Sequence, residues 1–122
     1  MATMTDTPEI LDFADAAAFE AWLAAHPDRP EVLLRIARKG AVHRTLTITD
    51  ALDVALCHGW IDSVRRRGDD EHYVQRYSPR RRGSAWSRRN VARAGELIAA
   101  GRMREPGRAA IRAAQSDGRW AR

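Results

Sequence analysis

Residues 60–78 read WIDSVRRRGDDEHYVQRYS. Side chains alternate from Trp60 to Arg65 and again from His72 to Ser78, in the pattern of two β-strands that each bury one face. Between them, residues 67–70 (RGDD) have the glycine and aspartate content of a turn. The stretch therefore predicts an antiparallel β-hairpin.

The sequence before the hairpin predicts two strands separated by a helix. Residues 10–13 and 32–37 are short aliphatic runs, which favour strands. Asp15 can cap the helix between them, because its carboxylate can accept from free backbone N–H groups. Apolar residues recur at helical spacing in that segment, at Phe19, Trp22 and Leu23.

Three more helices are predicted from capping residues and glycines. They run from Thr47 or Thr49 to Gly59, from Ser84 or Ser87 to Gly101, and from Pro106 to Gly118. The resulting order β-α-β-α-β-β-α-α indicates the α+β class. We expect one small domain in which an antiparallel sheet with a β-hairpin packs against about four helices.

Length and composition indicate one globular domain. The chain has 122 residues, 44% of them hydrophobic, which suits a single core. We expect residues 1–8 to be a flexible tail and residues 9–122 to form the domain. No apolar run is long enough to cross a bilayer, and Cys57, the single cysteine, cannot form an internal disulfide. The expectation is a soluble cytoplasmic protein with no membrane insertion, no metal and no cofactor.

Charge is distributed unevenly along the chain. Residues 1–61 hold five basic and nine acidic side chains, a net charge of −4, whereas residues 62–122 hold sixteen basic and seven acidic ones, a net charge of +9. Such asymmetry can mark a surface that binds anions. However, Lys39 is the only lysine among 21 basic residues, which is also typical of GC-rich coding. The arginine-rich half is therefore either a solvated face or an anion-binding face.

Motifs of well-defined enzymes are absent. The sequence contains no GxxxxGK[ST], GxGxxG, HExxH, CxxC or GxSxG. Cys57 lies in a helical pattern and is interpreted as a small core residue rather than a nucleophile. A metal site made of His58, Asp62 and His72 has no spacing in its favour.

Two segments resemble the YdeI/OmpD-associated family, whose members are also called bacteriocin-protection proteins. Residues 50–62 read DALDVALCHGWID, and residues 76–87 read RYSPRRRGSAWS, with Asn90 following. These are similar to the family's ALCxGWID and RFxPRxxxSxWSxxN stretches, with Tyr77-Ser78 in place of Phe-Thr. The resemblance covers roughly residues 10–120. It implies a protective or stress-related role, including antibiotic resistance, and supplies no reaction.

The hairpin register predicts a charged pair. With the turn centred near Asp69, Asp62 falls opposite Arg76, and Val64 falls opposite Val74. Asp62 lies near Trp60 and Ile61, so we expect its carboxylate to be partly buried and to need a cationic partner. The pair is either a cross-strand salt bridge or the polar floor of a pocket.

Further candidate ligand-binding residues lie within the two matched segments and just after the second. Trp60 and Trp86 are either core pillars or pocket walls, because indole rings bury a large apolar area in both roles. Arg80 follows Pro79, and Asn90 lies one turn inside a predicted helix. Together with the free N–H groups near Ser87, they could form an anion-binding corner.

Three functions remain open. The first is a small protective protein that binds a small aromatic or anionic ligand (a toxin, antibiotic or metabolite) in a pocket of tryptophan, arginine and aspartate side chains. The second is an enzyme that uses Asp62 of the same pocket as an acid or base. The third is nucleic-acid binding through the arginine clusters at residues 65–67, 80–82, 88 and 89. The sequence does not indicate an oligomeric state.

Overall fold

The computed structural model describes residues 9–42 and 44–120. The predicted flexible tail, residues 1–8, lies outside the described residues. The element order agrees with the prediction: β1 (Ile10–Leu11), α1 (Ala16–Ala25), β2 (Val32–Ala37), α2 (Ile48–Cys57), β3 (Trp60–Arg67), β4 (His72–Pro79), α3 (Arg88–Ala99) and α4 (Glu105–Ser116).

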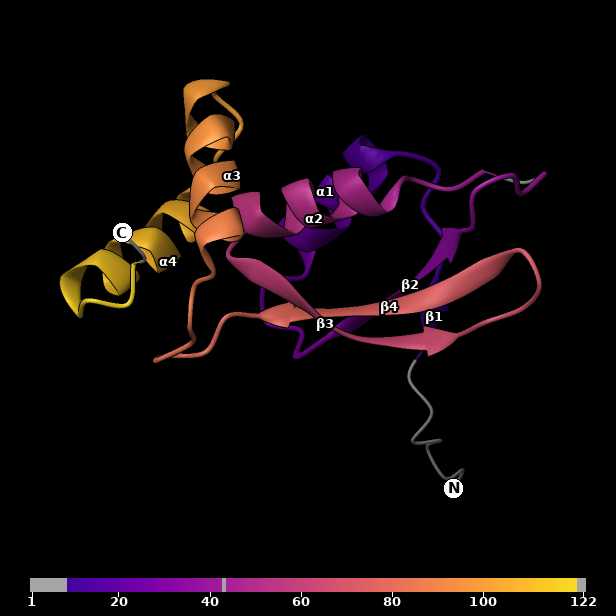
Figure 1. The fold of residues 1–122 in the computed structure, drawn as a ribbon, viewed down its shortest axis with the longest axis horizontal. Helices are drawn as coiled ribbons and strands as arrows, with labels where there is room; N and C mark the ends of the chain where they lie inside the picture. The colour runs from indigo at the N-terminus through magenta and orange to yellow at the C-terminus, as the bar shows by residue number, and fades with distance from the viewer. Residues whose placement is uncertain (1–8, 43, 121–122) are drawn as a thin grey trace.

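The strands form one sheet in the order β1-β2-β4-β3. Strand β4 runs antiparallel to both of its neighbours, which confirms the predicted hairpin. Strand β1 runs parallel to β2, because α1 carries the chain back between them, and the sheet is therefore mixed rather than wholly antiparallel. Helices α1 and α2 lie over one face of the sheet, and α3 and α4 lie beyond the end that is opposite the hairpin turn (Figure 1). The fold class is α+β.

Two apolar clusters hold these layers together. The larger cluster fills the space between the sheet and helices α1 and α2, and includes Phe19, Leu34, Trp60 and Tyr77. The second joins the end of α2 to α3 and α4, and includes Leu56, Trp86, Leu97 and Ile111. Trp60 and Trp86 thus belong to different clusters. Helix α2 contributes to both clusters and connects the two ends of the domain.

The predicted register of the hairpin is wrong, because the turn is centred on Asp70 rather than Asp69 and β3 carries a bulge. The ladder is irregular between Asp62 and Arg65, and Asp62 lies opposite Tyr77 rather than Arg76. Beyond the bulge, Arg66 rather than Val64 lies opposite Val74. A bulge inserts extra residues into one strand, and side-chain alternation alone does not reveal it.

Side-chain caps fix where the helices begin. Asp15 accepts from the N–H of Ala18, as predicted. Of the two candidates for α2, Thr47 is the cap, and its hydroxyl accepts from the N–H of Asp50. In α3 the cap is Ser87 rather than Ser84. These caps satisfy N–H groups that have no partner inside the helix.

Among the described residues, no helix combines the length and the apolar character needed to cross a membrane.

Candidate functional site

The start of α4 and the end of β4 both contact the turn between α2 and β3. Gly59 has a φ of +79°, a left-handed conformation that favours glycine. A Cβ atom here would lie 2.8 Å from the carbonyl oxygen of Pro106, so the start of α4 packs directly on the turn. The N–H of Arg80 donates to the carbonyl of Gly59 at 2.9 Å. The end of β4 is thereby held beside Trp60 and the first turn of α4.

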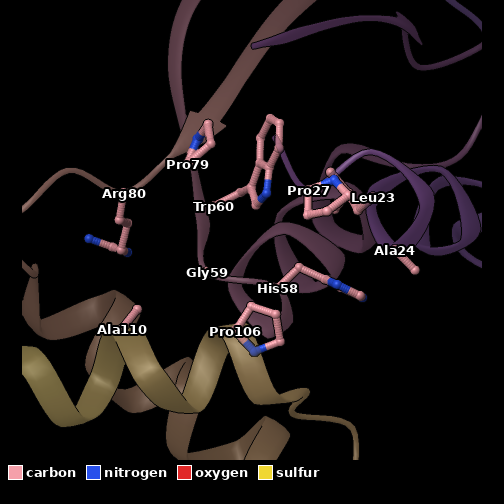
Figure 2. A pocket seen from close by; sticks show the side chains of 10 residues that line it. All are labelled: Leu23, Ala24, Pro27, His58, Gly59, Trp60, Pro79, Arg80, Pro106 and Ala110. Carbon is pink, nitrogen blue, oxygen red and sulfur yellow. The ribbon is translucent and has the colours of Figure 1, made fainter. Parts of the chain in front are cut away.

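A hollow of about 350 Å³ lies where these segments meet (Figure 2). This volume is within the range of small-molecule sites. Most of its walls are apolar, and Arg80 extends toward Ala110 of α4 (Figure 2). The lining residues are Leu23, Ala24, Pro27, His58, Gly59, Trp60, Pro79, Arg80, Pro106 and Ala110. We call this the Trp60 hollow.

Arg80 and Trp86 form a stacked pair beside this hollow. The guanidinium carbon of Arg80 lies 3.5 Å from the centroid of the Trp86 ring. Its Nη1 donates to the hydroxyl of Ser84 at 3.2 Å and to the carbonyl of Ala85 at 3.1 Å. Its Nε and Nη2 are buried and have no hydrogen-bond partner among the described residues, and neither has the Nε1 of Trp86. One stacked pair therefore carries three unpartnered buried donor nitrogens.

The electrostatic surroundings of Arg80 are unfavourable for its charge. Burial lowers its pKa to about 10, and the positive charge of Arg119 acts in the same direction. The negative charge of Asp62 opposes this shift. No carboxylate within the described chain makes an ion pair with Arg80. Buried cations are normally paired, so this one is an exception that needs a reason.

A second hollow of about 340 Å³ lies on the other side of the pair, and we call it the Trp86 hollow. Arg80 and Ala110 line both hollows, so Arg80 forms part of the wall between them. The Trp86 hollow is rich in arginine, and its one acidic residue is held by Arg119 at 2.7 Å. Its lining residues are Arg80, Arg81, Arg82, Trp86, Ala110, Ala113, Ser116, Asp117 and Arg119.

The structure does not bring the predicted site residues into one pocket. Asp62 is exposed, contrary to the prediction, and it lines a separate cleft of about 410 Å³ together with Asn90. The Ser87 hydroxyl accepts from the N–H of Asn90 at 3.1 Å as the cap of α3. Arg80 does not line that cleft and takes no part in the cap of α3. Arg80, Ser87 and Asn90 therefore do not form the predicted anion-binding corner.

Arg76 makes a different ion pair from the predicted one. Its Nε donates to Glu31 at 2.6 Å, and its Nη1 donates to the hydroxyl of Ser63 at 3.0 Å. Tyr77 rather than Arg76 lies opposite Asp62, and Arg76 instead pairs with Glu31, which comes just before β2. Arg76 is therefore a structural residue of the sheet rather than part of a pocket.

The sequence analysis missed a buried clamp between α2 and α3. Arg93 donates from Nε to one carboxylate oxygen of Asp53 at 2.7 Å and from Nη2 to the other at 2.6 Å. Asp53 is only 2% exposed. A signal was present, because a carboxylate among buried helix positions requires a cation. The sequence does not show which of the many arginines supplies it.

Cys57 and His58 serve the fold rather than a reaction. Burial raises the pKa of the Cys57 thiol, which keeps it protonated. The Nε2 of His58 lies 3.1 Å from the carboxylate of Glu20, which also accepts from the Nε of Arg104 at 2.9 Å. His72 contacts Asp69 instead. Within residues 9–42 and 44–120, no group of three metal-ligating side chains comes together.

Fold and site together define a small α+β protein in which a buried arginine–tryptophan pair separates two hollows. The family model described as domain of unknown function DUF8412 matches residues 11–110, most of the chain, and the protein belongs to this family. Comparisons with curated proteins and with solved structures find no match. The function must therefore be argued from the site itself.

Proposed function

We propose that this protein binds a small ligand that combines a carboxylate or phosphate group with an aromatic or other apolar body. The negative group bonds Arg80, and the body lies in the Trp60 hollow. The observation that carries this proposal is the unpartnered edge of the buried Arg80 guanidinium.

The two unpartnered atoms of Arg80 are a matched pair of donors. Nε–H and the adjacent Nη2–H are parallel, and together they fit the two oxygens of a carboxylate or phosphate. The same edge of Arg93 binds the two oxygens of Asp53 in this protein. A ligand anion would supply to Arg80 what Asp53 supplies to Arg93. The unpartnered Nε1 of Trp86 offers a further donor beside that edge.

The walls of the Trp60 hollow suit the rest of the ligand. Leu23, Trp60 and Ala110 provide apolar and aromatic surface, and indole rings favour stacking on flat apolar groups. The cavity volume fits a small aromatic acid rather than a polymer. An anion held at Arg80 and an aromatic body held near Trp60 match the ligand class expected from the sequence.

Binding requires a local rearrangement. Nε and Nη2 of Arg80 are closed to solvent, so a ligand meets them only when the guanidinium turns into one of its two hollows. The contacts that hold Nη1 are to the neutral acceptors Ser84 and Ala85. A ligand anion offers stronger, charge-assisted bonds in exchange.

The resemblance to YdeI/OmpD-associated proteins suggests the biological setting of this binding. A protein that holds a small ligand without a reacting group protects by sequestration. We therefore propose a role in resistance or stress response. Asp62 is exposed and lines neither hollow beside Arg80, which gives no support to an acid or base at this site.

The test is a titration of ¹⁵N-labelled protein with benzoate, with neutral benzamide as the matched control. Benzoate should shift the Nε–H signal of Arg80 and the Nε1–H signal of Trp86 in a saturable way. Benzamide has the same ring but no charge, and it should leave both signals in place. Equal shifts with both compounds, or no saturable shift with benzoate, would contradict the proposal.

Two variants distinguish binding at Arg80 from attraction of benzoate by the positive net charge of the protein. Arg80→Gln should weaken benzoate binding by at least about tenfold, because charge-assisted bonds are lost. Arg88→Gln removes the same charge from an exposed position that lines neither hollow and should change the affinity by less than about twofold. A similar loss in both variants would show that net charge alone attracts benzoate.

A further inference from the structure

A separate group of cations surrounds Tyr73 near the hairpin turn. A cleft of about 550 Å³ lies there, between the loop after β2 and the start of α2. Its lining residues are Ala37, Arg38, Lys39, Gly40, Ala41, Arg44, Thr45, Leu46, Thr47, Ile48 and Tyr73. Arg65 from β3 contacts the same tyrosine. We call this the Tyr73 cleft; the Arg80–Trp86 pair lies after the opposite end of β4 (Figure 1).

The bulge in β3 positions one of these cations. The Nε2 of Gln75, a buried side chain, donates to the carbonyls of Ser63 at 3.4 Å and Val64 at 3.2 Å. Its Oε1 then accepts from the Nε of Arg65 at 3.1 Å. The guanidinium carbon of Arg65 lies 4.3 Å from the centroid of the Tyr73 ring. Arg65 is thus a fixed cation rather than a freely moving surface side chain.

The other cations come from the loop after β2. The guanidinium carbon of Arg38 lies 5.6 Å from the centroid of the same Tyr73 ring. Lys39 and Arg44 line the cleft with it. Across the described chain, none of these three side chains or Arg65 takes part in an ion pair. Three cations therefore line the cleft, and a fourth, Arg65, lies against the ring of its Tyr73 wall.

Nearby acidic groups offset part of this charge, but within the described chain none of them makes an ion pair with these cations. Glu71 uses its carboxylate to accept from the N–H of Val42 at 2.9 Å. Asp69 is engaged with His72 at 2.9 Å. The first turn of α2, a ten-residue helix whose Thr47 and Ile48 line the cleft, adds the positive end of a helix dipole. One exposed acidic residue, Asp50, lies in that turn and reduces this last effect.

We infer that the Tyr73 cleft binds the pyrophosphate or polyphosphate group of a small ligand. Several closely spaced negative charges are the natural counterpart of three cations that line one cleft with a fourth beside its tyrosine wall. Guanidinium groups also bind phosphate oxygens in pairs. The cations gather at one cleft of small-molecule size. They do not form a stripe with the other arginine clusters, because residues 65–67 and 80–82 lie at opposite ends of the hairpin (Figure 1). A small ligand is favoured over a nucleic acid for this reason.

The experiment is isothermal titration of the full chain with inorganic pyrophosphate at physiological salt. Wild-type protein should bind it saturably, and the Nε–H signal of Arg65 should shift in a parallel NMR titration. The double variant Lys39→Gln/Arg44→Gln should weaken binding by at least about tenfold. These two residues are exposed and do not contact Tyr73 through their charge, so circular dichroism should show an unchanged fold.

A control of equal charge tests the location of the site. Arg81→Gln/Arg82→Gln removes two positive charges at the far end of the hairpin and should change pyrophosphate affinity by less than about twofold. Equal losses in both double variants would overturn the inference, as would the absence of saturable binding. Tighter binding of a twelve-residue single-stranded oligothymidylate than of pyrophosphate would also overturn it, in favour of a nucleic-acid surface. The Lys39→Gln/Arg44→Gln variant should leave benzoate binding at Arg80 unchanged, because neither residue lines a hollow beside Arg80, so the two sites can fail independently.

Discussion

Two arginines of this protein use the same edge of the guanidinium in opposite ways. Arg93 directs Nε and Nη2 at the buried carboxylate of Asp53. Arg80 buries the same two nitrogens without an acceptor and rests on the ring of Trp86. The hydrogen bonds that Arg93 donates to Asp53 raise the pKa of Arg93. Burial instead lowers the pKa of Arg80 to about 10.

The comparison separates a structural arginine from a binding one. The Asp53–Arg93 clamp is complete, so it contributes to stability and has no donor to offer a ligand. Arg80 retains the cost of burying its charge and donors, a cost that protein interiors normally avoid. A ligand that supplies the missing acceptor would recover that cost as binding energy. The two arginines should therefore respond to mutation in opposite ways.

The largest effect is expected at the clamp. Asp53→Asn keeps the shape of the side chain but removes its charge and turns an acceptor into a donor that faces Arg93. We expect the free energy of unfolding to fall by about 2–3 kcal/mol; the figure lies below that for a fully buried pair because the Arg93 side chain is 38% exposed. Urea unfolding followed by circular dichroism measures this change.

Benzoate binding provides the control for that variant. Folded Asp53→Asn protein should bind benzoate as the wild type does, because Asp53 lines neither hollow beside Arg80. A stability loss below about 0.5 kcal/mol would show that solvent screens the clamp, as for surface pairs. The paired Arg93 and the unpaired Arg80 would then not differ in their contribution to stability.

A smaller effect on stability is expected at Arg80. Arg80→Met keeps an unbranched apolar stem on Trp86 but removes the buried charge. The lost cation–π contact and Nη1 hydrogen bonds are offset by relief from desolvation, so the free energy of unfolding should change by less than about 1 kcal/mol. Benzoate binding should be lost in the same protein.

Thermal melting and benzoate titration on the same Arg80→Met sample test this pairing. Destabilisation by more than about 2 kcal/mol would make Arg80 a structural residue like Arg93. Retained benzoate affinity would remove Arg80 from the ligand site. Either result would contradict the assignment of a structural role to Arg93 and a binding role to Arg80.

The sequence predicted the fold better than the site because the fold depends on local signals. Alternation on both sides of Gly68 revealed the hairpin, and capping residues such as Asp15 marked the helix ends. The parallel pairing of β1 with β2 and the bulge after Asp62 were missed. Both depend on where distant segments meet, which neither spacing nor alternation specifies.

Predicting the site depends even more on which distant segments come into contact. Trp60 and Arg80 do share a hollow, as expected from their separate motifs. A turn centred on Asp70 rather than Asp69 was enough to take Asp62 out of register with Arg76. The partners of arginines are especially hard to assign in this sequence, because 20 arginines compete for 16 carboxylates. Only the tertiary structure shows that Arg93 is clamped and that Arg80 is not.

A small effect, on stability alone, is expected at Glu20, which lies between these extremes. It is partly exposed and accepts from both Arg104 and His58, so it is paired like Asp53 but solvated. Glu20→Gln should lower the free energy of unfolding at pH 7 by about 0.5–1 kcal/mol, the range of exposed ion pairs. Chemical unfolding of both proteins at several pH values measures the difference.

The pH dependence shows whether this small effect is ionic. The hydrogen bond from Arg104, followed by that from His58, holds the pKa of Glu20 below its ordinary value in the folded protein. The unfolded chain therefore binds the proton more readily, and the stabilisation is present above the unfolded-state pKa and is lost as the pH falls through the lowered folded-state pKa. The difference between wild type and Glu20→Gln should shrink toward zero by about pH 3. A difference that stays constant from pH 7 to pH 3 would mean that Glu20 acts through packing, and that charge pairing in this protein matters only where it is buried, as at Asp53 and Arg93.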